Sequence, residues 1–297
     1  MESNSKNRTL TLVYGMRNFI LAVFVLAALC GSARAEILEY CNPSGWEERG
    51  QEYVQWLAPS IRLNGASGTM CYYDKQQNWM YIISAGHLFD HFRLRVNVRQ
   101  TAKVEVFYYH NVKLAHPRVY SAEVLASVFN HDDQDGGAYD VSLLRFHPDV
   151  PDLTYIPIAP KEYKLEQGRV YHSVGCDQEG KGQPTTEPAH YLVRVVGEQS
   201  IGRSITQVLT VPGPRHGRSG GGVFSDDGYL VFICSREGGG SKYGMWTSLS
   251  QIHRFLGEHG YSFIADEIPA RRMSIVDLDN PGHTYSHDYV LVPLGNK

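Results

Sequence analysis

Between about Ser60 and Ser248 the sequence consists of short apolar runs separated by turn residues. The runs are rich in Val, Ile, Tyr and Thr, which favour strands, and glycine, proline and aspartate recur between them. Many short strands with frequent turns favour an all-β barrel or sandwich over alternating strands and helices. We expect strands at Gly68–Tyr73, Trp79–Ser84, Lys103–Tyr109, Val141–Phe146, Arg169–Gly175, His190–Val196, Ser204–Val211, Tyr229–Cys234 and Lys242–Trp246.

One amphipathic helix is expected directly after these strands. Ser248 can cap it, its apolar residues Leu249, Ile252 and Leu256 fall on one face, and Gly257 ends it. Gln51–Leu57 is a second, shorter helical candidate. Beyond residue 264 the chain becomes a proline-containing tail, in which residues 290–292 are apolar enough to pair as an edge strand.

The first 35 residues are expected to lie outside the fold. Lys6, Arg8 and Arg17 precede an almost unbroken apolar stretch from Phe19 to Cys30, and the small-residue motif Ala33-Arg34-Ala35 follows. This order is typical of a secretory signal peptide. The alternative is a membrane anchor, but about twelve apolar residues are fewer than the roughly 20 that span a bilayer. We therefore expect cleavage after residue 35, a secreted or periplasmic mature chain, and no stable membrane insertion.

Charge and histidine spacing exclude several classes of function. A net charge of −3 argues against a general nucleic-acid binder, which would be clearly basic. None of the 13 histidines lies in a spacing typical of zinc sites, so no metal and no cofactor are expected.

Four cysteines remain after the expected cleavage: Cys41, Cys71, Cys176 and Cys234. In an oxidising compartment they could pair in three ways, and sequence alone does not choose among the pairings. Buried free thiols are the alternative.

One serine stands among glycines in Gly217-Arg218-Ser219-Gly220-Gly221-Gly222 and is followed by an apolar strand, unlike a flexible linker. A serine hydroxyl becomes a nucleophile when a histidine takes its proton and a carboxylate orients that histidine. His87 follows the strand at Trp79–Ser84 and the small pair Ala85-Gly86. Asp140 directly precedes the apolar run that begins at residue 141. These are the candidate base and acid.

Together these segments resemble the motifs of trypsin-like (chymotrypsin-fold) serine peptidases. Ser84-Ala85-Gly86-His87 is similar to the family's Thr/Ser-Ala-Ala-His, Tyr139-Asp140-Val141-Ser142-Leu143-Leu144 to Asp-Ile-Ala-Leu-Leu, and Gly217-Arg218-Ser219-Gly220-Gly221 to Gly-x-Ser-Gly-Gly. Gly65-Ala66-Ser67-Gly68-Thr69 and Gly244-Met245-Trp246-Thr247 match two further family strands. The resemblance covers about residues 60–264.

The resemblance implies two successive six-stranded-type β-barrels with a C-terminal helix and the active site between the barrels. The implied organisation is a signal peptide at 1–35, an N-terminal extension at 36–59, a peptidase domain at 60–264 and a tail at 265–297.

The resemblance also implies roles for single residues. Ser219 would attack the scissile carbonyl, His87 would shuttle the proton, and Asp140 would hold the imidazole. The N–H groups of Gly217 and Ser219 would form the oxyanion hole. Ser235 would begin the edge that pairs with an extended substrate. Gly213 and Gly244 would form the base and wall of a side-chain pocket, which favours a neutral apolar or aromatic residue unless Glu237 charges its rim.

Two positions depart from the family pattern. Arg218 stands where the family often has an aspartate that pairs with a newly cut N-terminus, so activation through such a terminus is not expected. Gly222 stands where proline is usual.

The predicted function is an exported serine endopeptidase acting on protein or peptide substrates. One alternative is a catalytically silent binding protein on the same fold. The other is an esterase, because Gly217-Arg218-Ser219-Gly220-Gly221 also fits Gly-x-Ser-x-Gly, although that elbow needs a strand before the serine and a helix after it.

Overall fold

The computed structural model describes residues 56–89, 101–110, 113–114, 117–130, 139–150, 153–179, 183–185, 187–201, 204–237, 243–266, 273–276 and 284–287. The expected signal peptide, Cys41, most of the Gln51–Leu57 candidate and the apolar run at 290–292 lie outside these residues. In the described part of the chain, no helix is long and apolar enough to cross a bilayer.

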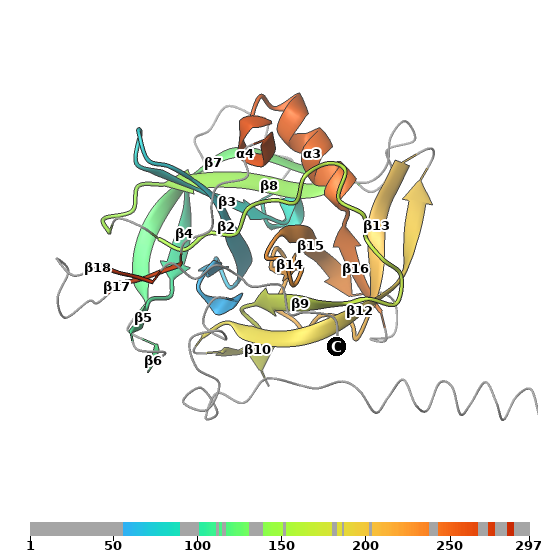
Figure 1. Ribbon diagram of the computed structural model, residues 1–297, viewed down its shortest axis with the longest axis horizontal. Coiled ribbons are helices and arrows are strands. Elements are labelled where there is room, and N and C mark those ends of the chain that lie inside the picture. Colours follow the sequence, from blue (N-terminus) through green and yellow to red (C-terminus); the bar gives the residue numbers. More distant parts are fainter. Residues whose placement is uncertain are drawn as a thin grey trace, which may run out of the picture. The chain divides into compact units, whose positions relative to one another are not determined.

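The first barrel is a closed antiparallel sheet with strand order β1-β2-β3-β8-β7-β4 (Figure 1). Its strands are β1 (Ser60–Leu63), β2 (Ala66–Asp74), β3 (Trp79–Ser84), β4 (Thr101–Val106), β7 (Arg118–Asn130) and β8 (Tyr139–Phe146). Side chains alternate along each strand, so that every second residue points inward. Ile61, Met70, Ile82, Val104 and Leu144 fill the interior, and all are fully buried.

The second barrel is also closed and antiparallel, with strand order β12-β13-β16-β15-β14-β9. Its strands are β9 (Val170–Gly175), β12 (Ala189–Ile201), β13 (Ser204–Val211), β14 (Gly222–Phe224), β15 (Leu230–Glu237) and β16 (Gly244–Thr247). Its core is more aromatic than that of the first barrel. Phe232 packs edge-on against both Tyr171 and Trp246.

Among the residues that the structure describes, three further sheets have two strands each. They pair β5 (Tyr109–His110) with β6 (Lys113–Leu114), β10 (Gln178–Glu179) with β11 (Gln183–Pro184), and β17 (Met273–Val276) with β18 (Thr284–His287).

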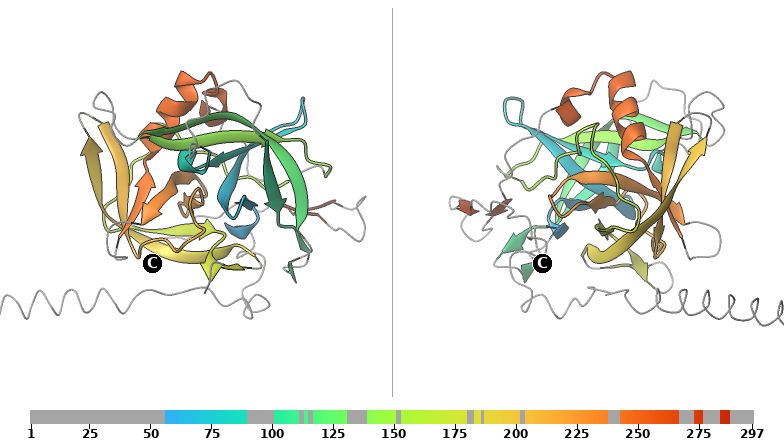
Figure 2. Two further views of the ribbon diagram at one scale, coloured as in Figure 1. Left: turned by 180° about the vertical axis from the view of Figure 1, so that it is seen from behind. Right: turned by 45° about the vertical axis from the view of Figure 1, so that its right-hand side comes forward.

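The helix α3 (Leu249–Glu258) follows β16 and contacts strands of both barrels, β8 in the first and β13 and β15 in the second (Figure 2). The Ser248 hydroxyl accepts a hydrogen bond from the backbone N–H of Gln251 and caps the helix. Leu249, Ile252 and Leu256 are buried on one face, as expected. A short helix, α4 (Phe263–Asp266), follows.

The predicted fold class is confirmed, because the chain forms two closed six-stranded antiparallel barrels with a helix after the second. Strands β3 and β13 have the predicted bounds. The strand expected at Lys103–Tyr109 ends earlier, at Val106, and Tyr109 belongs to β5. Strands β1 and β7 were not predicted.

The described cysteines carry free thiols. Cys71, Cys176 and Cys234 are all buried, and none forms a disulfide. Of the two possibilities open from the sequence, the structure therefore has free thiols at these three positions.

Candidate active site

His87 lies on a short 3-10 turn, η2 (Gly86–Leu88), directly after β3. The glycine before it is required by space, because a Cβ at Gly86 would collide with the carbonyl oxygen of Val128 on β7. This close packing fixes the turn against the barrel wall. The imidazole remains partly accessible, with 20% of the side-chain surface exposed.

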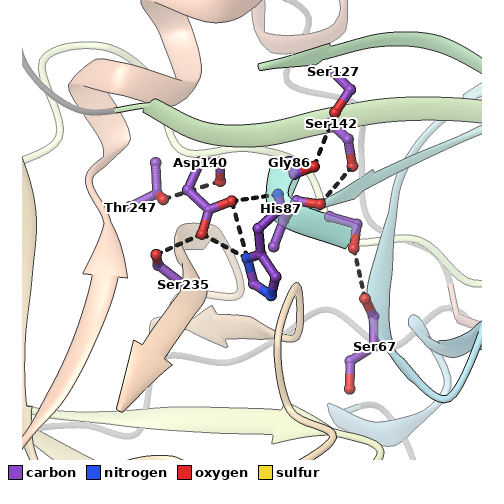
Figure 3. Close-up of polar contacts among 10 residues, drawn as sticks. Ser67, Gly86, His87, Ser127, Asp140, Ser142, Ser235 and Thr247 are labelled. Atoms are coloured by element: carbon purple, nitrogen blue, oxygen red, sulfur yellow. Dashed lines mark hydrogen bonds and ion pairs between the residues drawn. The ribbon is translucent and has the colours of Figure 1, made fainter. Parts of the chain in front are cut away.

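Asp140, near the start of β8, orients this imidazole. Its Oδ2 lies 2.9 Å from His87 Nδ1, and its Oδ1 accepts the backbone N–H of His87 at 2.9 Å (Figure 3). The aspartate is buried, with 4% exposure. Because Nδ1 is engaged by a fixed carboxylate, Nε2 is the ring nitrogen that remains for other partners.

The second barrel reaches across to the same carboxylate. Ser235, on β15, donates its hydroxyl to Asp140 Oδ2 at 2.5 Å. Thr247, at the end of β16, donates to the backbone carbonyl of Asp140 at 3.1 Å (Figure 3). The buried carboxylate therefore accepts hydrogen bonds from both barrels, which satisfies its charge and restricts its rotation.

Ser219 follows a tight turn at residues 215–218. The N–H of Arg218 donates to the carbonyl of Arg215 at 3.2 Å, and Gly217 has φ +86°. A positive φ at the third residue is typical of a type II turn and requires glycine. The carbonyl of His216 is held by the N–H of Gln178 at 2.7 Å. Since C=O and N–H of a trans peptide point in opposite directions, the Gly217 N–H points away from Gln178.

The first barrel supports this loop through one serine. Ser67, on β2, donates its N–H to the carbonyl of Ser219 at 2.9 Å and its hydroxyl to the carbonyl of Gly217 at 2.8 Å. The same hydroxyl accepts the N–H of Cys176 at 2.7 Å. Both carbonyls of the loop are thereby turned toward the first barrel. In the described part of the chain, the N–H groups of Gly217 and Ser219 donate no hydrogen bond.

A pocket of about 320 Å³ joins these elements. His87 and Ser219 both line it, although no hydrogen bond joins their side chains within the described residues. Its lining consists of His87, Phe129, Asp140, Pro214, Arg215, His216, Gly217, Ser219, Cys234, Ser235 and Arg236. Of these, Asp140 is the only carboxylate, whereas Arg215 and Arg236 are cations.

The structure brings most of the predicted site residues together in this pocket, but Gly213 and Gly244 are not among its lining residues. A Cβ at Gly244 would lie 2.6 Å from Trp246 Nε1 and 2.8 Å from Pro214 Cδ. The indole of Trp246 therefore occupies the space that a side chain at position 244 would need.

Besides the hydroxyls of Ser219 and Ser235, the pocket lining contains one thiol, that of Cys234. Burial raises the pKa of its thiol well above the ordinary range, so the thiol stays protonated at neutral pH. A protonated thiol is a poor nucleophile, which leaves the hydroxyl of Ser219 as the better candidate.

Three residues of the site were missed by the sequence analysis: Ser67, Asp177 and Gln178. Ser67 lies inside the Gly65–Thr69 motif, so its position was noted but its contacts were not. Asp177 binds the buried guanidinium of Arg218. A buried arginine needs an acidic partner. A buried Arg218 therefore implies such a partner, but nothing in the sequence points to residue 177 in particular.

Comparisons with known proteins agree with this fold. The family model for the trypsin-like peptidase domain matches residues 66–232. A mutant of human heparin binding protein has 15% sequence identity and a TM-score of 0.51, over 69% of this chain and 92% of that one. A serine endoprotease from Yersinia pestis has 16% identity and a TM-score of 0.47, over 69% of this chain and 64% of that one.

At 15% identity the heparin binding protein structure indicates the fold alone. No curated protein sequence matches the chain. The family match covers more than half of the chain and includes the segments that carry His87, Asp140 and Ser219. The chain belongs to the trypsin-like peptidase domain family, and it is a serine-type peptidase.

Proposed function

We propose that the chain is an exported serine endopeptidase in which Ser219 is the nucleophile, His87 the general base and Asp140 the residue that orients the base. The observation that carries the proposal is the 2.9 Å contact between His87 Nδ1 and Asp140 Oδ2, beside a pocket that Ser219 also lines. This contact leaves Nε2 of the imidazole for the proton of the serine. Catalytic hydrogen bonds are often long before substrate binds.

The proposed reaction has two steps. Ser219 Oγ forms a bond to the scissile carbonyl carbon while His87 Nε2 takes the hydroxyl proton. The C–N bond then breaks, and the imidazolium gives that proton to the leaving amine. Water attacks the acyl-enzyme by the same route, which releases the carboxylic acid and restores Ser219. Asp140 stabilises the imidazolium without taking its proton.

The proposed oxyanion hole consists of the N–H groups of Gly217 and Ser219. Its support is the type II turn, which directs the Gly217 N–H away from Gln178. Donors that are fixed before the reaction stabilise the developing negative charge without any further cost of reorganisation.

For substrate binding we propose that Ser235 begins the edge that pairs with an extended peptide, since this strand continues along the pocket to Arg236. The predicted subsite with Gly213 at its base and Gly244 at its wall lies outside the pocket lining. The exposed cations Arg215 and Arg236 do line the pocket. The charges at this rim favour acidic side chains near the scissile bond over the neutral apolar residue expected from the sequence.

The catalytic proposal is tested with the mature chain, its Ser219→Ala variant and a Ser225→Ala control in the β14–β15 turn. A fluorophosphonate should label the parent and the control but not Ser219→Ala, and casein cleavage should follow the labelling. Hydrolysis of short acyl esters without casein cleavage would indicate the esterase. Absence of both labelling and hydrolysis in the folded parent would indicate the silent binding protein.

Export is proposed from the sequence of residues 1–35. Expression of the full chain in a secreting host should yield extracytoplasmic protein whose N-terminal sequence begins at Glu36. Retention of residues 1–35 on the mature, membrane-bound protein would contradict the proposed cleavage.

A further inference from the structure

Directly before Ser219, Arg218 is fully buried and forms a bidentate ion pair. Its Nε donates to Asp177 Oδ1 at 2.8 Å and its Nη2 to Asp177 Oδ2 at 2.7 Å. Neither side chain has any exposed surface. The third nitrogen, Nη1, donates to the hydroxyl of Ser173 at 3.2 Å. The guanidinium carbon lies 3.9 Å from the ring centroid of Tyr191. The guanidinium is thus held in one orientation by partners on several sides.

Two residues of the turn at residues 215–218 are held by neighbouring residues of one segment. The Asp177 carboxylate holds the Arg218 side chain, and the N–H of the next residue, Gln178, holds the carbonyl of His216. This segment is itself anchored, because the carbonyl of Asp177 accepts the N–H of Thr185 at 2.9 Å. Any rotation of the peptide between His216 and Gly217 would break the bond to Gln178. Any withdrawal of the turn would separate two fully buried charges.

We infer that Arg218 and Asp177 are positioning residues whose ion pair locks the 215–219 loop with the Gly217 and Ser219 N–H groups toward the pocket. This inference rests on the proposed role of these groups as an oxyanion hole. Asp177 follows β9 and Arg218 precedes β14, both strands of the second barrel, and Arg218 remains charged at every relevant pH. The Arg218–Asp177 ion pair therefore forms in the folded chain without the help of a newly cut, charged N-terminus.

A buried ion pair does not by itself indicate a functional role, since replacing both partners with uncharged residues is often tolerated or stabilising. Removing one partner, however, leaves the other charge buried and unpaired. The two roles therefore predict different behaviour for single and double variants. A purely structural pair would recover both stability and activity in the double variant. A positioning pair would recover stability alone, because no ion pair then holds the side chain of residue 218 in one orientation.

The test uses Asp177→Asn, Arg218→Met and the double variant, with Glu123→Gln as the control. Glu123 also binds an arginine through two nitrogens, Nε and Nη2 of Arg145 at 3.0 Å, but on the partly exposed surface of the first barrel. We expect each single variant to lower kcat by roughly 10²- to 10³-fold, as for the loss of one oxyanion donor, with little change in KM. The double variant should regain resistance to denaturant but keep the low kcat, and Glu123→Gln should resemble the parent.

Amide hydrogen exchange of residues 215–221, followed by mass spectrometry, gives a second readout that needs no activity. Exchange in this loop should be faster in the single and double variants and unchanged in Glu123→Gln. Where a single variant does not fold, Arg218→Lys should give an intermediate exchange rate. Lysine retains the positive charge but cannot make the planar two-nitrogen contact with the carboxylate. Unchanged loop exchange in Asp177→Asn, or full recovery of kcat in the double variant, would overturn the inference. If the folded parent fails to cleave any peptide, the proposed function is wrong. The exchange rates of residues 215–221 still test whether the ion pair holds the loop.

Discussion

The two barrels each bury one aspartate beside the site, and the two aspartates have different partners. Asp140 in the first barrel faces an imidazole with 20% of its surface exposed to the pocket. Asp177 in the second faces a guanidinium with no exposed surface. An imidazole can accept and release a proton, whereas a guanidinium stays charged. The first arrangement is suited to moving a proton, and the second to holding a backbone conformation.

Each half of the site is also supported by the opposite barrel. Ser235 and Thr247 of the second barrel bind Asp140. Ser67 of the first barrel binds the carbonyls of Ser219 and Gly217. The site therefore depends on the packing between the barrels as much as on either barrel alone. The following predictions, from the largest expected effect to the smallest, test this division between proton transfer and positioning.

The largest effect is expected for His87→Ala. Loss of the proposed base should reduce kcat by about 10⁶-fold, as for loss of the nucleophile, because the two act as a unit. Folding should be retained, since the side chain is partly exposed. The measurement is kcat on a peptide substrate together with the thermal midpoint. A His87→Ala variant that folds and keeps substantial activity would show that another group is the base.

Asp140→Asn should follow, with a loss of roughly 10⁴-fold in kcat through the wrong imidazole tautomer. The change is nearly isosteric, but the amide nitrogen cannot accept the hydrogen bonds that reach the carboxylate now. Comparison with Asp177→Asn sharpens the contrast between the barrels. Only Asp140→Asn should alter the pH dependence of kcat/KM, because only Asp140 contacts the proposed base. The same pH profile in both variants would contradict this division.

Ser67→Ala should have a smaller effect on both stability and rate. The substitution removes the hydrogen bonds that the Ser67 hydroxyl makes with the Gly217 carbonyl and the Cys176 N–H. A buried polar group without a hydrogen-bond partner costs about 1–3 kcal/mol. We expect a comparable loss in the free energy of unfolding and a decrease in kcat of about 10-fold for a slightly displaced loop. Ser127→Ala is the control, because Ser127 donates its hydroxyl to the carbonyl of Gly86 at 3.1 Å, in the turn that carries His87 and not in the Ser219 loop. Equal rates for the two variants would remove Ser67 from the positioning contacts.

The smallest effect is expected at Asp226, in the turn between β14 and β15. Its hydrogen bond to His172, at 2.8 Å, holds the pKa of the carboxyl below its ordinary value. A lowered pKa in the folded state contributes stability above the ordinary value of 3.8, which is lost as pH falls through the lower folded value. Asp226→Asn should therefore lower the free energy of unfolding by at most about 1 kcal/mol at pH 5, with the difference vanishing in acid. Its kcat should equal that of the parent, which denaturant unfolding and kinetics together can check.

How far the sequence predicts the molecule depends on whether the determining feature is local. The strand β3 and the helix α3 were predicted because apolar periodicity and the Ser248 cap lie within a few residues. The strand β7 was missed because it contains Ala and Glu, is mostly half-buried, and its alternation is broken by a bulge between Val124 and Ala126. Ser219, His87 and Asp140 were selected as candidates because each lies in a short motif. The partner of Arg218 was not, because only the folded chain brings residue 177 beside residue 218.

The support of each half by the opposite barrel has a consequence for dividing the chain. A cut in the segment that connects β8 to β9 would place His87 and Asp140 on one fragment and Ser219 on the other. Each fragment would then carry exposed halves of the shared contacts, Ser67 on one and Ser235 with Thr247 on the other. Each fragment could be fused to one of two proteins that bind each other. Binding would bring the two barrels together, and proteolysis would then report that binding.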